Sequence, residues 1–175
     1  MNMGRQTLVI LLLVTAAFAS PAYAQSQSLD IQASGTIAAS CSLTKASEFL
    51  AANLSANGSV SATATVNCNT GFSIAAASAN GAVKRVPPGT PPANFSNSLA
   101  YSFSLSVPLD SGGPAVANCS SAAMLANSCS LSSGGGTAAA KTATLTASWT
   151  IPVLPTRLLA GGYSDTITLT IAAVP

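Results

Sequence analysis

The chain has 175 residues, of which only 6% are charged and 5% are aromatic, and it contains no histidine. A net charge of +2, without any run of basic residues, gives no support for nucleic-acid binding. Histidine is the commonest general base and a frequent metal ligand, and the four carboxylates are scattered along the chain. We therefore expect no enzyme activity, no metal site, no cofactor and no small-molecule substrate.

The first 24 residues have the pattern of a secretory signal peptide. Arg5 precedes an apolar run at 8–19, and Ala22 and Ala24 place small residues at the two positions that a signal peptidase reads. The run is too short for a membrane-spanning helix, which needs roughly 20 residues. We expect cleavage after Ala24 and export of the remaining chain.

Residues 28–37 alternate strictly between apolar and polar side chains. The apolar face consists of Leu29, Ile31, Ala33, Gly35 and Ile37. Exposed N-terminal tails are seldom patterned in this way. Two interpretations remain open: the segment is the first strand of the domain, or it is a donor strand that fills a groove in a neighbouring molecule. The second predicts an N-terminal extension at 25–37 and a single domain at 38–175.

The domain itself begins with short strands separated by turn residues. The segment 45–57 is polar and alanine-rich, with room for one helical turn, and alternation then predicts a strand over 60–68. A second strand starts at Gly71, and Asn80-Gly81 is typical of a tight hairpin turn. The proline-rich segment 84–92 predicts a loop, because proline cannot donate to a strand ladder.

The second half of the domain continues this pattern. Alternation is strongest over 99–107, whereas 115–132 predicts a loop with a possible helical turn. A further strand is expected over 143–153, where Pro152 and Pro155 end it. Six or seven short strands without a convincing amphipathic helix predict an all-β sandwich.

Four cysteines follow the predicted signal peptide. An even number of cysteines in an exported chain indicates disulfides, and Cys41, Cys68, Cys119 and Cys129 allow three pairings. Short loops close most easily, which favours a Cys41–Cys68 bond and a Cys119–Cys129 bond.

The last stretch, 161–174, predicts a half-buried strand. After two glycines, one face carries Tyr163, Ile167, Leu169, Ile171 and Ala173, and the other carries Thr166, Thr168 and Thr170. Asp165 interrupts the apolar face just after the turn, where its carboxylate can reach water or a loop amide. A strand at the end of the chain needs a partner strand.

This ending, with an aromatic residue after glycine, then Asp-Thr and alternating threonine and apolar residues, resembles the end of the spore coat protein U family. That family includes the subunits of archaic chaperone–usher pili. The resemblance implies an immunoglobulin-like β-sandwich that lacks one strand. It also implies that a periplasmic chaperone fills the gap first and a neighbour's N-terminal arm fills it afterwards. In that case the inserting residues are Leu29, Ile31, Ala33, Gly35 and Ile37, and the Cys41–Cys68 bond matches the family's bridge.

The implied function is that of a structural subunit of a surface pilus or fimbria-like fibre, with a role in adhesion and biofilm formation. Its partners would be neighbouring subunits, a periplasmic chaperone and an outer-membrane usher, and it would pass through the periplasm to the cell surface. The alternative is a self-complete secreted β-sandwich that binds a glycan or a protein, including an adhesin at a fibre tip. That alternative predicts exposed aromatic or polar groups clustered on loops, whereas Trp149 and most other aromatic residues lie on predicted strand faces.

Overall fold

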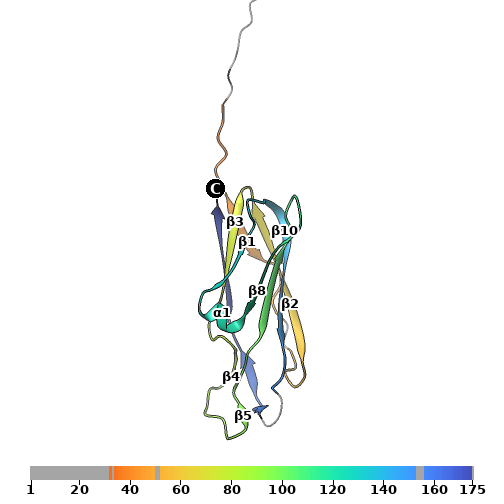
Figure 1. Cartoon of the computed structure of the whole chain (residues 1–175), viewed down its shortest axis with the longest axis vertical. Coiled ribbons are helices and arrows are strands. Elements are labelled where there is room, and N and C mark those ends of the chain that lie inside the picture. Colours follow the sequence, from red (N-terminus) through yellow and green to blue (C-terminus); the bar gives the residue numbers. More distant parts are fainter. Residues whose placement is uncertain (1–31, 33, 50–51, 153–155, 175) are drawn as a thin grey trace, which may run out of the picture. The chain divides into compact units, whose positions relative to one another are not determined.

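The computed structural model describes residues 32, 34–49, 52–152 and 156–174 (Figure 1). The predicted signal peptide at 1–24 and the predicted donor residues Leu29, Ile31 and Ala33 lie outside the described residues. The chain divides into two units, 1–36 and 37–175, and the second is described below. In its described part, strands in antiparallel sheets predominate and one short helix accompanies them, which confirms the all-β class.

The larger sheet has five antiparallel strands in the order β1-β2-β10-β7-β8 (Figure 1). Their bounds are Cys41–Lys45 for β1, Gly58–Cys68 for β2, Ser102–Val107 for β7, Ala115–Ser120 for β8 and Ala138–Trp149 for β10. Because successive side chains of a strand point to opposite faces, one face of this sheet is apolar. On that face Val66, Phe103 and Leu105 are at most 1% exposed.

The second sheet packs its apolar face against the same core. Its three strands run in the order β13-β3-β9. Their bounds are Gly71–Ser78 for β3, Cys129–Ser132 for β9 and Ile167–Val174 for β13. Phe72, Ile74 and Leu131 from this sheet belong to one buried cluster with Val66 and Phe103 from the larger sheet. Two sheets that enclose one core form a β-sandwich.

The remaining strands are short and form two small sheets, β12-β4-β6 and β11-β5. Their bounds are Val83–Val86 for β4, Phe95–Ser96 for β5, Ser98–Leu99 for β6, Arg157–Leu158 for β11 and Gly162–Ser164 for β12. In Figure 1, β4 and β5 lie at the end of the domain that is remote from the C-terminus. Arg85 braces this end, because its side chain donates to the carbonyl oxygens of Ala160 and Pro87 at 3.0 and 3.2 Å.

The disulfides are the two that local loop closure favoured. Cys41 bonds to Cys68, its direct partner in the β1–β2 register, and Cys119 bonds to Cys129. The first bond therefore fixes β1 beside β2 at the start of the domain. The second joins β8 to β9, the last strands of the two sheets on one side of the core.

The expectation of a loop over 115–132 is wrong. This segment holds β8, the helix α1 (Ser121–Leu125) and β9, although the helical turn expected there is present. Within β8 and β9 three of the four buried positions are Ala115, Ala117 and Cys129, and only Leu131 is large, so the alternation of apolar side chains is weak in the sequence. Ser120 caps the helix by accepting a hydrogen bond from the Ala123 N–H at 3.1 Å.

Three other expectations about the first half of the domain need correction. A turn does follow β3, but β3 and β4 do not pair with each other, so Asn80-Gly81 joins two sheets and does not form a hairpin. The predicted loop 84–92 begins only at Pro87, since β4 extends to Val86. The helical turn expected within 45–57 is absent from the described residues of that segment.

Two predicted strands also have different bounds. The segment 99–107 is divided into β6 and β7, because Tyr101 bonds to the start of α1: its N–H donates to Ser121 Oγ and its carbonyl accepts from the Ser121 N–H. The strand expected over 143–153 begins earlier, at Ala138, and ends at Trp149. There the indole N–H donates to the Ala56 carbonyl at 2.9 Å. Pro155 lies outside the described residues.

We predict that both disulfides stabilise the domain. The double substitution of Cys119 and Cys129 by serine opens a loop with a sequence separation of 10, and loop entropy predicts a loss of about 3 kcal/mol in the free energy of unfolding. Opening the Cys41–Cys68 loop, with a separation of 27, is expected to cost slightly more. Urea denaturation measures both. Detection of free thiols in the oxidised native protein by mass spectrometry would contradict the pairing.

Candidate functional site

The last strand, β13, is an edge strand of its sheet. It pairs along its whole length with β3, and its other edge has no strand partner in the part of the chain that the structure describes. Its inward side chains Ile167, Leu169 and Ile171 are only half-buried, whereas Phe72 and Ile74 of β3 are at most 1% exposed. The core is therefore incompletely covered along β13.

The first strand of the other sheet is in the same situation. β1 pairs with β2 on one side, and no described residue pairs with its other edge. The inward side chains of Cys41 and Leu43 are again half-buried. β1 and β13 lie close together although they belong to different sheets. Two rows of backbone donors and acceptors without strand partners thus border the same gap.

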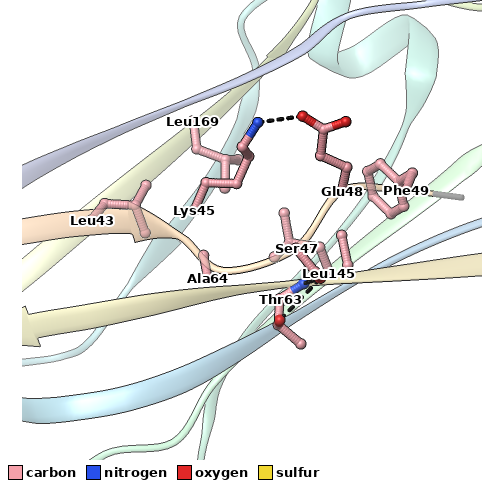
Figure 2. A pocket seen from close by; sticks show the side chains of 10 residues that line it. Leu43, Lys45, Ser47, Glu48, Phe49, Thr63, Ala64, Leu145 and Leu169 are labelled. Atoms are coloured by element: carbon pink, nitrogen blue, oxygen red, sulfur yellow. Dashed lines mark hydrogen bonds and ion pairs between the residues drawn. The ribbon is translucent and has the colours of Figure 1, made fainter.

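A cavity of about 370 Å³ opens between these two strands (Figure 2). Leu43 of β1, Leu169 of β13 and Leu145 of β10 line it, so both sheets contribute apolar surface. We call this cavity and the free edges of β1 and β13 the groove. The rest of the lining consists of Lys45, Ser47, Glu48, Phe49, Ala62, Thr63 and Ala64.

The opposite side of the sandwich is closed. There the edge strands β8 and β9 are joined by the Cys119–Cys129 bond and by α1, which connects them along the chain. Met124 of this helix is fully buried in the core. The domain therefore has one closed side and one open side, and the open side is the groove.

The chain that leaves β1 runs along one end of the groove. The backbone N–H groups of Ala46 and Ser47 both donate to the Thr63 carbonyl at 3.0 Å, and the Thr63 N–H donates to Ser47 Oγ at 2.7 Å. Lys45 and Glu48 form an ion pair beside these bonds (Figure 2). Lys45 lowers the pKa of Glu48, chiefly by the hydrogen bond that its ammonium group donates to the carboxylate and then by its positive charge. Both side chains are well exposed, so the pair adds little stability.

Asp165 positions the start of β13, and its role was not foreseen from the sequence. Its carboxylate accepts hydrogen bonds from Ser78 Oγ and the Tyr101 hydroxyl, both at 2.6 Å, and from the Asn80 N–H at 3.1 Å. Burial, and then the bond to Asp165, raise the pKa of Tyr101, so this phenol stays protonated as a donor. The predicted strand over 161–174 is therefore interrupted at Asp165, where β12 ends and β13 has yet to begin.

Two of the five predicted donor residues fall within the described part of the chain, and both are exposed. Ile37 is 91% exposed, and no atom lies within 4 Å of a Cβ placed on Gly35. The entry of the chain into the domain is fixed by Asn69, whose amide donates to the Ala38 carbonyl and accepts from the Ser40 N–H at 2.9 and 2.8 Å. The donor-strand role of these residues stays a prediction.

The described residues offer little other chemistry. No group of three or more histidine, cysteine, aspartate or glutamate side chains among them could hold a metal ion. None of the helices in this part of the chain is long and apolar enough to cross a membrane. Among the large apolar side chains that are exposed there, only Phe95 is aromatic.

Comparison of the chain with models of protein families and with curated proteins gives no match. The function has to be argued from the groove and from the residues that surround it.

We predict that Asp165→Ala destabilises the domain by about 2–3 kcal/mol, because it leaves several partly buried donors without their acceptor. Tyr101→Phe removes only one donor of the same network and is expected to cost about 1 kcal/mol. Urea denaturation of both variants gives the comparison. Equal stability of Asp165→Ala and the unchanged protein would show that Asp165 does not hold β13 in place.

Proposed function

We propose that the protein is a structural subunit of a surface pilus or fimbria-like fibre, and that subunits join by donor-strand exchange. In this proposal the domain is an immunoglobulin-like sandwich that lacks one strand, and the N-terminal extension of a neighbouring subunit supplies it. One observation carries the proposal: among the described residues, the edge strands β1 and β13 of the two main sheets have no further strand partner, and both lie on the same side of the core. The half-buried apolar side chains of these two strands, β1 and β13, border one groove.

An inserted strand would pair with a free edge of the groove and complete the core. Its backbone would bond to β1 or β13, as in other cases of strand addition, and alternate side chains would enter the groove. The strict alternation of 28–37 meets this requirement. Full burial of Leu29, Ile31 and Ile37 would contribute about 1.5–3 kcal/mol for each side chain.

The extension is continuous in sequence with β1, one of the two strands that border the groove. Asn69 holds the backbone of Ala38 and Ser40, and β1 begins at the next residue, Cys41. In this proposal the residues before Ala38 pass to a neighbouring subunit, while the disulfide keeps β1 in its own sheet. This arrangement supports a role for 25–37 as an arm directed to a neighbour.

The cellular route in this proposal comes from the resemblance to archaic chaperone–usher pilins, and two features of the protein agree with it. The disulfides indicate an oxidising, extracytoplasmic location. A free edge beside an apolar groove invites unwanted strand pairing, so the proposal includes a periplasmic chaperone that occupies the groove and an outer-membrane usher that assembles subunits. Burial of each subunit in a fibre would also tolerate a surface with few charges. The proposed role needs no catalytic residue.

We predict that register in the arm decides assembly. Ile31→Asp places a carboxylate on the inserting face, where an unpaired buried charge costs about 3–5 kcal/mol, so multimers should be lost. Gln32→Asp adds the same charge on the opposite face and should leave multimers unchanged. The measurement is the ladder of detergent-stable multimers on non-reducing gels, with export of the monomer as the control.

Gly35→Leu provides a second test of the same face. No atom of the subunit lies within 4 Å of the added Cβ, so the monomer itself should fold normally. Overpacking of the neighbour's groove should still block multimers. If all three variants assemble normally, or if Ile31→Asp eliminates the folded monomer, the arm is an ordinary first strand. A self-complete secreted binding module or adhesin would then be the better interpretation.

A further inference from the structure

We propose that the chain carries its own cap on the groove: Lys45, Glu48 and Phe49 cover one end of it, and an incoming strand displaces Phe49. This inference rests on the proposed function, because it describes how the same groove is protected before a strand enters. It concerns the free subunit. It assigns a role to Lys45, the last residue of β1, and to Glu48 and Phe49, which follow β1 and belong to no helix or strand.

Phe49 covers part of the core that the missing strand leaves open. It is half-buried, packs against the buried cluster and lines the cavity together with Leu145 and Leu169 (Figure 2). β1 ends at Lys45, and Ser47, Glu48 and Phe49 continue the lining of the cavity beyond it. The aromatic ring therefore covers apolar surface that an inserted strand would otherwise cover.

The attachment of this segment allows Phe49 to leave without unfolding the sheet. Ala46 and Ser47 are bound to Thr63 by four hydrogen bonds, which keep the base of the segment on β2. Among the described residues, the backbones of Glu48 and Phe49 make no hydrogen bond. Rotation of the chain beyond Ser47 thus moves Phe49 away from the cavity and leaves the bonds to Thr63 intact.

The ion pair adds a barrier at the mouth of the groove. Lys45 is on the same face of β1 as Cys41 and Leu43, but its side chain reaches the mouth and joins Glu48. A charged side chain on an edge strand, lysine above all, is a known protection against unwanted strand pairing. Because both side chains are well exposed, the pair is weak and a correctly patterned strand can displace it.

The experiment measures how fast a labelled peptide with the sequence of residues 25–38 binds to the mature monomer, 25–175, by fluorescence anisotropy. Phe49→Ala removes the proposed cap and should increase the association rate about fivefold to tenfold, since a half-buried phenyl group no longer has to leave. Phe95→Ala is the matched control, because Phe95 is 41% exposed and belongs to β5, which contributes no residue to the groove. Its rate should equal that of the unchanged protein.

A second variant keeps the proposal testable if Phe49→Ala folds poorly. Glu48→Gln removes the ion pair at nearly constant size and should raise the rate about twofold. The unchanged protein should bind faster at high salt, and Glu48→Gln should lose this dependence.

Equal rates for Phe49→Ala, Glu48→Gln and the unchanged protein would overturn the cap while the groove remains a strand receptor. If the peptide binds to none of the proteins, both the cap and the proposed function are wrong. Faster binding by Phe95→Ala as well as Phe49→Ala would also overturn the cap, because the effect would then be a general loosening of the domain.

Discussion

The structure depends on how the two sheets satisfy the backbone hydrogen bonds at their edges. Every open sheet ends in strands with free donors and acceptors, and a protein has to cover, close or expose them. On one side of this sandwich the Cys119–Cys129 bond and α1 join the edge strands β8 and β9. On the other side β1 and β13 adjoin a gap, with inward side chains such as Leu43 and Leu169 that are only half-buried. This asymmetry distinguishes the groove from an ordinary sheet edge.

The sequence predicts the strands whose buried positions hold large side chains. Phe103 and Leu105 reveal β7 by alternation, and Ile167 and Leu169 reveal β13 in the same way. Where most buried positions hold alanine or cysteine, as in β8 and β9, the same periodicity is present but its contrast is too weak to read. The order β13-β3-β9 arises from pairings between segments far apart in the sequence, so the residue pattern alone could not place the groove, and a missing strand was expected only from the family resemblance.

Residues with polar side chains define the site in ways that local patterns do not show. Asp165 looks like a solvated turn residue, yet it gathers donors from the end of β3 and from Tyr101, just before β7. Lys45 and Glu48 look like part of a polar connection, yet they line the mouth of the groove beside Phe49. The signal for each lies in three-dimensional proximity, which a single sequence does not contain.

Because the chain has few charges, the free edges of β1 and β13 have little electrostatic protection against unwanted strand pairing. Many proteins keep exposed strand edges apart by charged side chains, but only 6% of this chain is charged, and Lys45 is the only charged residue within β1 or β13. The outer faces of these strands carry Ser42, Thr44, Thr168 and Thr170, which repel nothing. Protection of the edges therefore has to come from specific contacts. The disulfide and α1 provide them on one side, and on the other side the proposed cap at 45–49 has to suffice until a donor strand arrives.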